Sequence, residues 1–296
     1  MNKITALVLT YNEEKNISSC LKNIFNHVDE IIVLDSGSTD STLEIASSFN
    51  CKVYTNPFIN QAHQINWAID NISFKNNWII RVDADENWNQ QGFKILNQII
   101  LQNNYKAVSV KMKIYFQGKW LRWGGQFGND FVRAFNKNYF IKSYAWMDEH
   151  INVNGDVFKS SICVEEKNYD RMFSLTLWTS KHNVYSIREC ISYFSKQKDS
   201  FKSLSTKVLI KQKLKQYIFP IFPDFIGPLF LFLYRYLIQL GFLDGIRGFK
   251  YCFLQSLWYR YLVNLKISQY KINSKSRGID PLELAKIEYE LQLKKS

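Results

Sequence analysis

The sequence predicts an α/β protein with a mostly parallel sheet flanked by helices, followed by a C-terminal α-helical extension. Three observations lead to this prediction. Short apolar runs alternate with helix-like segments through the first half of the chain, the order that parallel sheets with crossover helices require. Polar or acidic residues directly follow several of these runs. The last third of the chain then changes to a basic, aromatic and helical composition.

The elements of the first half follow from their apolar spacing. The run 31–34 is apolar throughout, as in a strand that is buried on both faces, whereas Ile17 and Ile24 share one side of a helix. Ser41 and Glu44 form an S-x-x-E capping box, which predicts that Ser41 caps the helix it begins. The predicted strands are Ile4–Thr10, Glu30–Asp35, Lys52–Tyr54 and Trp78–Val82, and the predicted helices are Ile17–Phe25, Ser41–Phe49 and Gln61–Ile72.

Beyond these elements, the pattern changes twice. Residues 106–164 predict shorter strands and glycine-containing turns, a mixed region that offers a second binding surface. Residues 218–243 and 246–266 predict helices that lie in a membrane interface, because no charge-free stretch reaches the roughly 20 residues of a spanning helix. The alternative is that these helices only pack on the rest of the protein. A linker at 273–278 and a final helix capped by Asp280 are expected at the end.

The composition restricts the classes of function. The net charge is +12, and residues 196–296 hold 18 of the 38 Lys and Arg residues but 7 of the 26 Asp and Glu residues. Basic and aromatic helices indicate an anionic membrane surface, and no nucleic-acid-binding motif is present, so no nucleic-acid partner is expected. The five scattered cysteines form no C-x-x-C pair, which fits a reducing compartment. Without a signal-peptide pattern at the N-terminus, a cytoplasmic location is expected.

Candidate chemistry lies at the ends of the predicted strands. Tyr11, Asn12, Asp35 and Asp83 each follow a strand, and the carboxyl ends of parallel strands meet at the edge where such sheets bind ligands. In Asp83-Ala84-Asp85, one carboxylate can accept hydrogen bonds from a ribose while the other binds a divalent cation that bridges phosphates. The alternative is that Asp85 and its neighbour Glu86 merely cap the next helix.

The loop after the first strand excludes two nucleotide-binding families. Residues 10–14 contain no glycine, so the chain has neither the G-x-G-x-x-G turn of a dinucleotide fold nor a P-loop there. The loop is also acidic. A nucleotidyltransferase, which needs a basic, glycine-rich phosphate loop, is therefore disfavoured.

Taken together, the strand-end segments resemble glycosyltransferase family 2 with the GT-A fold, a Rossmann-like sheet. The resemblance is carried by Thr10–Glu14, Asp35–Asp40 and Asp83–Glu86, with Gln64, Asn66 and Ala68 similar to the helix between the second and third of these blocks. Later segments resemble the bacterial subgroup that builds lipopolysaccharide core, capsule and related glycans. These segments are Gly118–Trp120, Trp123–Gly125, Trp146–His150, Trp178–Asn183 and Gly241–Gly245.

The resemblance implies inverting transfer of one sugar from a nucleotide-diphosphate sugar, UDP-linked or other, to a hydroxyl of a lipid-linked glycan, with Mg²⁺ or Mn²⁺. It implies that Asp85 holds the metal and that Asp148 or Glu149, with Glu149 favoured, is the general base; a solvated turn is the alternative. Trp120, Trp123 and Gly125 are the acceptor candidates, with core packing as the alternative for the tryptophans. The residues expected to bind the nucleotide sugar are Thr10, Tyr11, Asn12, Glu13, Asp35, Gln64, Asp83 and Ala84.

Two departures from the family pattern matter. The Q-x-x-R-W signature of processive members is missing, which favours transfer of a single sugar. Arg81 precedes Asp83 where the resemblance leads us to expect an apolar or small residue. This arginine is expected either to contact phosphate or to pair with Glu86.

These expectations combine into one organisation. Residues 1–195 form the catalytic domain, with a nucleotide-sugar part (1–105) and an acceptor part (106–195). Residues 196–272 associate with the inner face of the cell membrane, and 273–296 are a linker and final helix. The oligomeric state stays open. One alternative is a polyprenyl-phosphate sugar synthase, disfavoured because clear spanning helices are lacking; another is a non-catalytic, membrane-associated protein that binds nucleotide sugars.

Overall fold

The computed structural model describes residues 3–147, 150–168, 173–198 and 224–293. The chain divides into two compact units. The first comprises Met1–Leu121 and Gln126–Phe173, and the second comprises Arg122–Gly125 and Ser174–Ser296. A four-residue segment inside the first half of the sequence therefore belongs to the second unit.

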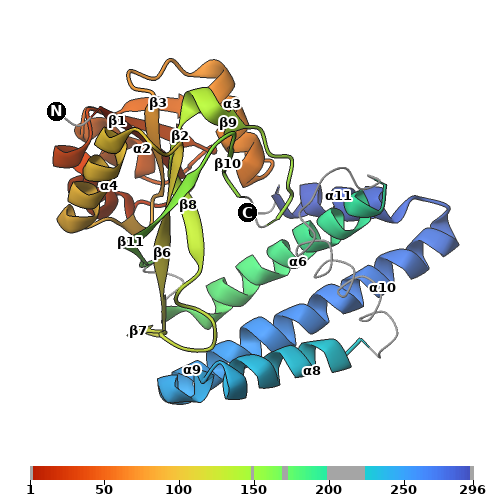
Figure 1. Cartoon of the computed structure of the whole chain (residues 1–296). Helices are drawn as coiled ribbons and strands as arrows, with labels where there is room; N and C mark the ends of the chain where they lie inside the picture. Colours follow the sequence, from red (N-terminus) through yellow and green to blue (C-terminus); the bar gives the residue numbers. More distant parts are fainter. Residues whose placement is uncertain (1–2, 148–149, 169–172, 199–223, 294–296) are drawn as a thin grey trace. The chain divides into compact units, whose positions relative to one another are not determined.

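The first unit is built on one large sheet with the strand order β3-β2-β1-β4-β8-β6-β11-β5 (Figure 1). Strands β3, β2, β1 and β4 are parallel, β8 runs antiparallel between β4 and β6, and β6 pairs in parallel with β11. This sheet confirms the predicted α/β class. The strands are β1 (Ile4–Thr10), β2 (Glu30–Asp35), β3 (Lys52–Thr55), β4 (Trp78–Asp83), β5 (Glu86–Asn87), β6 (Ala107–Phe116), β8 (Asp130–Asn136) and β11 (Val157–Glu166), with β7 (Lys119–Trp120) paired to β6 and a separate pair of β9 (Phe140–Ile141) and β10 (Asn152–Val153).

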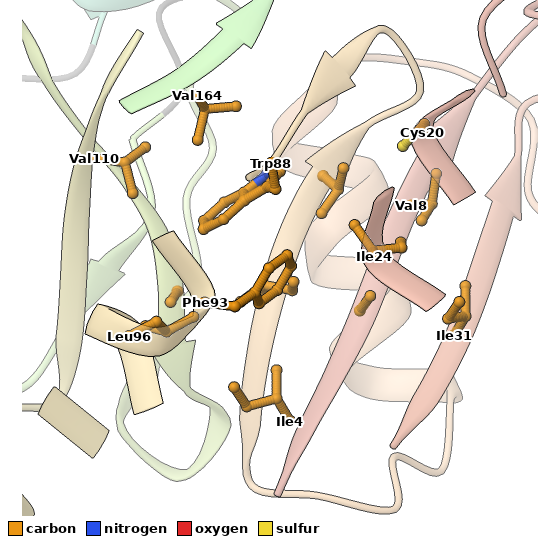
Figure 2. Close-up of a cluster of buried hydrophobic side chains, with 14 of the residues drawn as sticks. Ile4, Val8, Cys20, Ile24, Ile31, Trp88, Phe93, Leu96, Val110 and Val164 are labelled. Carbon is orange, nitrogen blue, oxygen red and sulfur yellow. The ribbon is translucent and has the colours of Figure 1, made fainter. Parts of the chain in front are cut away.

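Helices cover both faces of this sheet. On one face, α1, α2 and α4 bury their apolar sides in a cluster that includes Val8, Ile24 and Phe93 (Figure 2). On the other face, α3 packs Ile65 against Leu7 of β1. Successive residues of β1 thus enter different cores, which explains its uninterrupted apolar sequence. The helical segments of this unit are α1 (Ile17–Ile24), η1 (Phe25–His27), α2 (Thr42–Ser48), α3 (Gln61–Asn71), α4 (Gln90–Gln102) and η2 (Lys137–Tyr139).

The second unit is helical, as expected for the C-terminal extension. Its longest helices, α6 and α10, pack on one another and on α11. No single helix among the described residues is long and apolar enough to span a membrane; only the bent pair 226–238 and 241–277, which meets at 71°, has the length and composition when taken together. The helical segments are α6 (Leu175–Lys198), α8 (Ile226–Leu233), η4 (Tyr234–Ile238), η5 (Gly241–Asp244), α9 (Gly245–Cys252), η6 (Phe253–Trp258), α10 (Tyr259–Arg277) and α11 (Pro281–Leu293).

Two local predictions are wrong. The capping box does not form, because the Ser41 side chain makes no cap hydrogen bond; Asp40 Oδ1 accepts instead from Thr42 N at 3.0 Å. The expected linker at 273–278 is helical as far as Arg277, where Gly278 ends α10 in a left-handed conformation. The predicted cap of the final helix is confirmed, since Asp280 Oδ1 accepts from Leu282 N at 2.8 Å.

Candidate active site

The ends of three parallel strands meet at one edge of the sheet. Thr10 pairs with Asp35 across β1 and β2, and Leu9 pairs with Asp83 across β1 and β4. The residues predicted from sequence to bind the nucleotide therefore lie on neighbouring strands at the same height. This is the edge at which open parallel sheets bind their ligands.

Reciprocal hydrogen bonds join the loops that follow β1 and β2. Asn12 N donates to Ser38 Oγ at 2.9 Å, and Asn12 Oδ1 accepts from Thr39 N at 2.8 Å. Glu13 N donates to Thr42 Oγ1 at 2.8 Å. Asn12 has a positive φ of 50°, a conformation that asparagine tolerates better than most residues. The two loops therefore form one fixed wall of the site.

Asp35 is fully buried at the base of this wall. Its Oδ2 accepts from Gly37 N and Ser38 N, both at 2.8 Å, and its Oδ1 accepts from Ser38 Oγ at 2.5 Å. The carboxylate thus shapes the loop after β2 as well as standing at the predicted nucleoside position. Gln64 of α3 extends this network, since its Nε2 donates to Ser36 Oγ at 3.2 Å and to Asn56 O at 2.9 Å.

Two arginines contact the acidic turn, residues 83–86, from the sheet side. Arg81 Nη2 donates to both carboxylate oxygens of Asp83, at 3.0 and 3.1 Å. Arg133 of β8 donates from Nε and Nη2 to Glu86 Oε1, at 3.0 and 2.7 Å, and its Nη2 lies 3.7 Å from Asp83 Oδ2. Arg81 therefore binds Asp83, a partner that neither sequence alternative named. The network thus pairs two guanidinium groups, of Arg81 and Arg133, with the carboxyl groups of Asp83 and Glu86.

Glu86 is the most confined acid of this network. It is 1% exposed, and its Oε2 has no hydrogen-bonding partner among the described residues. Burial raises the pKa of Glu86, and the Arg133 guanidinium opposes that shift. Burial would lower the pKa of Arg133, yet Glu86 and Asp83 raise it above its ordinary value. The net result is a Glu86 pKa raised to about 7, so the charge of this carboxyl group changes near neutral pH.

Asp85 points to a different group of side chains. Asn168 Nδ2 donates to Asp85 Oδ2 at 3.2 Å and lies 3.3 Å from Glu13 Oε2. One amide thus bridges two carboxylates that come from the ends of β1 and β4. Burial, followed by the charges of Glu86, Asp85, Asp83 and Glu13, raises the pKa of the Cys20 thiol well above its ordinary value. The edge of the sheet is therefore locally electronegative.

This donor set fits a hard divalent cation that is held partly by its substrate. Among the described residues, no three His, Cys, Asp or Glu side chains form a complete metal cage. Mg²⁺ commonly binds one or two carboxylates together with phosphate oxygens and waters. Asp85, with Glu13 nearby, has the chemistry for that role, and the excess negative charge around it would be neutralised by such an ion.

A hollow of about 600 Å³ opens beside Asp85. Most of its lining side chains are polar. Two of them, Lys22 of α1 and Lys167 after β11, carry ammonium groups of the kind that bind phosphate. Lys167 Nζ pairs with Glu165 at 2.6 Å. The hollow leaves space next to the acidic turn for a polar ligand. Its lining residues are Asn16, Ser19, Lys22, Asn23, His27, Ala84, Asp85, Asn87, Trp88, Asn89, Gln90, Glu165 and Lys167.

Thr10 carries a signal of its own. It is 5% exposed, and its Oγ1 has no hydrogen-bonding partner among the described residues. An unsatisfied buried hydroxyl costs free energy, so its retention at the ligand-binding edge fits a group that a bound donor completes. Tyr11, by contrast, is 40% exposed.

The acceptor candidates are distributed over both units. Trp120 of β7 is half-buried in the first unit, where Lys113 Nζ lies 4.9 Å from its ring centroid. Trp123 and Gly125 belong to the second unit. Asp148 and Glu149, the candidates for general base, lie outside the described residues.

Arg133 and Asn168 are the site residues that the sequence reasoning missed. Arg133 had a detectable signal, because it is a lone charge within the apolar strand sequence Phe-Val-Arg-Ala-Phe of β8. A charge on a buried strand needs an opposite partner. Asn168 had none, since it follows β11 in a polar segment and reaches Asp85 only through the fold.

Known proteins match the part of the chain that contains this site, and one match extends over most of the chain. A family model described as "Glycosyl transferase family 2" matches residues 5–159. An uncharacterized glycosyltransferase of Rickettsia typhi is 25% identical over 286 residues, covering 94% of this chain and 90% of that protein. An uncharacterized glycosyltransferase of Rickettsia bellii is 35% identical over 115 residues, which is 38% of each chain.

Two further similarities are confined to shorter parts. A Methanococcus voltae protein named dolichyl N-acetyl-alpha-D-glucosaminyl phosphate 3-beta-D-2,3-diacetamido-2,3-dideoxy-beta-D-glucuronosyltransferase is 37% identical over 83 residues, or 24% of this chain and 26% of that protein. A crystal structure of glucosyl-3-phosphoglycerate synthase from Mycobacterium tuberculosis, in complex with Mn²⁺, uridine diphosphate and phosphoglyceric acid, is 24% identical with a TM-score of 0.33. That match covers 37% of this chain and 43% of the synthase.

Proposed function

Since the chain belongs to glycosyl transferase family 2, we propose that it moves one sugar, with inversion, from a nucleotide-diphosphate sugar to a hydroxyl of a lipid-linked glycan. The observation that carries the donor half of this proposal is the convergence of Thr10, Asp35 and the acidic turn at one sheet edge. UDP is one candidate nucleotide. The surface glycans in question are lipopolysaccharide, capsule or related polymers, as the subgroup resemblance implies.

The residues at the sheet edge divide the work on the donor. In this proposal, Asp35 and Asp83 accept hydrogen bonds from hydroxyl and N–H groups of the nucleoside, and Arg81 holds the Asp83 carboxylate in one orientation. The orphaned Thr10 hydroxyl supplies a further hydrogen bond. Asp85 would hold the Mg²⁺ or Mn²⁺ ion, and such an ion would supply positive charge that stabilises the diphosphate leaving group.

The acceptor half needs a base that removes the proton of the attacking hydroxyl. Asp148 and Glu149 match the family's position for this group, and we retain Glu149 as the favoured residue. Among the described residues on either side of them, Ser143 O accepts from Asn66 Nδ2 of α3 at 2.7 Å, and Ile151 is buried in the same cluster as Ile65 of α3. Trp120, Trp123 and Gly125 are the proposed acceptor contacts.

A lipid-linked acceptor agrees with the composition of the second unit. Its aromatic and basic residues suit an anionic membrane surface, and the proposed location is the cytoplasmic face of the cell membrane. The name of the Methanococcus voltae relative also specifies a dolichyl-linked sugar as acceptor. Within this proposal, residues 1–195 form the catalytic part, 196–272 the membrane-associating part and 273–296 the end of the chain.

A labelled-transfer assay tests the proposal. A panel of radiolabelled nucleotide sugars is incubated with the protein, Mn²⁺ and a bacterial lipid extract, and label in the lipid phase is counted. Glu149→Gln should lower turnover far more than donor binding, whereas Asp156→Asn, an exposed acid in the same part of the chain, should change neither. Loss of turnover in Asp148→Asn alone would reassign the base. Label that stays in water with every donor, or that reaches only polyprenyl phosphate, would contradict the proposed acceptor.

A further inference from the structure

The turn that joins η4 to α9, together with the first part of α9, exposes several large apolar side chains. Ile246 is 67% exposed, Leu243 is 50% exposed and Phe242 is 43% exposed. Phe249, one turn farther along α9, is 39% exposed. Folded proteins rarely leave such a contiguous apolar surface open unless it binds something. We call residues 242–249 the exposed turn.

The charge around the exposed turn is one-sided. Between Phe225 and Ile279 the sequence contains eight Lys and Arg residues and one acid, Asp244. Asp244 is 4% exposed, and its Oδ2 faces backbone N–H groups rather than solvent. Arg247 and Lys250 of α9 are both exposed. Apolar side chains flanked by cations suit an anionic lipid surface, whereas a second copy of this face would bring like charges together.

The buried Asp244 attaches a second segment to this turn. Its Oδ2 accepts from Arg122 N at 3.0 Å and from Trp123 N at 2.9 Å. Gly124 N donates to Gln239 O at 2.8 Å. The backbone of Trp123 is thus fixed by Asp244, whereas Trp123 itself is 41% exposed. Tryptophan is the side chain that lipid headgroup regions favour, because its ring is apolar and its N–H is polar.

Close backbone packing makes this attachment rigid. A Cβ on Gly241 would lie 2.8 Å from Cys252 Sγ and 2.9 Å from Arg235 O, closer than such atoms approach. Gly124 has a φ of +69°, and a Cβ there would lie 3.0 Å from the same sulfur. Only glycine fits both positions. The segments Trp123–Gly125 and Gly241–Gly245 are therefore held together by close backbone packing.

We propose that the exposed turn and Trp123 form a single docking surface for anionic lipid, in which Asp244 is the positioning residue that fixes Trp123. The link between this surface and the acceptor rests on the proposed function, in which the acceptor is a lipid-linked glycan. Residues 122–125 connect β7 to β8, so lipid bound at this surface also immobilises the segment that carries two of the proposed acceptor contacts. The acceptor glycan and its anchor would then be received by one continuous part of the chain.

Vesicle sedimentation of the full-length protein tests the surface. Vesicles of phosphatidylglycerol and phosphatidylcholine in equal parts should bind the wild type, and vesicles of phosphatidylcholine alone should bind it much less. Ile246→Glu and Trp123→Ala should each lower the partition coefficient about tenfold, the cost of losing one inserted apolar side chain. Leu101→Glu is the matched control, because Leu101 is an 83% exposed apolar residue on α4 of the first unit. This variant should sediment with the vesicles as the wild type does.

The role of Asp244 is tested by comparing two substitutions. Asp244→Asn keeps an oxygen that can accept both N–H groups, so it should retain vesicle binding; Asp244→Ala should lose it. The thermal unfolding of both variants is measured alongside. If Asp244→Ala is folded and binds vesicles like the wild type, the positioning role is wrong. If it does not fold, Trp123→Ala still decides whether the tryptophan contributes.

Other outcomes separate this proposal from the proposed function. Asp85→Asn should bind vesicles like the wild type, so failure of sugar transfer leaves vesicle binding as an independent measurement. Equal binding of Ile246→Glu and the wild type would overturn the lipid surface. Sedimentation velocity without vesicles covers the remaining occupant: a dimer that Ile246→Glu dissociates would show that a second copy of the chain covers the exposed turn, and the lipid proposal would fall.

Discussion

Replacing Arg133 with methionine tests whether a buried ion-pair network supports the acidic turn. Arg133 contacts Glu86 Oε1 at 2.7 and 3.0 Å and lies 3.7 Å from Asp83. Methionine fills similar volume without the charge. The substitution leaves the Glu86 carboxylate, which is 1% exposed, without its partner. Removing one partner of a buried pair costs about 3–5 kcal/mol of unfolding free energy, and we expect a loss in that range.

The loss should depend on pH in a direction that the burial of Glu86 determines. Without Arg133, burial raises the folded-state pKa of Glu86 further above its unfolded value, so the folded protein binds a proton more readily than the unfolded chain. Stability is therefore retained at low pH and lost as the pH rises through the folded-state pKa. Urea unfolding of Arg133→Met at about pH 5 and about pH 8 should show the larger deficit at the higher pH.

A double substitution controls for the loss of packing. Arg133→Met combined with Glu86→Leu removes both charges, and it should recover most of the lost stability because no unpaired charge stays buried. Donor binding should recover less, since Asp83 would still lack one of its two arginines. An Arg133→Met protein as stable as the wild type, or one whose deficit is the same at both pH values, would refute this reasoning.

Three further predictions follow from single contacts. Thr10→Val removes a buried hydroxyl that has no described partner, so unfolding free energy should be unchanged or higher while donor affinity falls about tenfold in calorimetric titration; a normal affinity would contradict the role of Thr10. Asn168→Ala removes the amide between Asp85 and Glu13, and the KM for the donor should rise about tenfold at limiting Mn²⁺ and less when Mn²⁺ is saturating; an unchanged KM would contradict the bridge. Gly241→Ala should destabilise the protein by about 1–3 kcal/mol, because the new Cβ would clash with Cys252 and Arg235. Thermal unfolding indistinguishable from the wild type would show that the backbone packing at Gly241 is not tight.

The parallel half of the sheet was predictable because three of its strands, β1, β2 and β4, are buried on both faces. The bounds predicted for β1 and β2 match the structure, since a continuous apolar run between polar residues has few other conformations. The placement of Thr10, Asp35 and Asp83 at one edge followed from the same pattern. The parallel order alone brings these residues together, so the proposed donor half of the site needed no knowledge of side-chain contacts.

Contacts made by residues distant in sequence were not predictable. Arg81 was expected to contact phosphate or to pair with Glu86, but it binds Asp83 on the same strand. Glu86 binds Arg133 of the neighbouring strand β8 instead. Asn168 reaches Asp85 across 83 positions of sequence. Local propensity does not encode which strand neighbours β4 on its other side, and that neighbour decides the charge balance of the turn.

The predictions of two helix ends were wrong for a similar reason. Ser41 has the residue pattern of a cap, yet the adjacent Asp40 offers a carboxylate to Thr42 N while its Oδ2 accepts from Glu14 N at 3.1 Å. The contact with the loop after β1 favours Asp40 over Ser41. At residues 273–277, polar side chains indicated a linker, but an exposed helix end tolerates them, and Lys275 and Arg277 favour its C-terminus.

Donor binding to Asp85→Asn and to the wild type, with and without Mn²⁺, tests the central claim most directly. Asparagine keeps the shape of the side chain and the contact with Asn168 while it removes the charge that would hold the ion. Isothermal titration with the nucleotide sugar should show that Mn²⁺ tightens binding to the wild type and leaves binding to Asp85→Asn unchanged. An equal gain from Mn²⁺ in both proteins would contradict the assignment of the metal to the acidic turn.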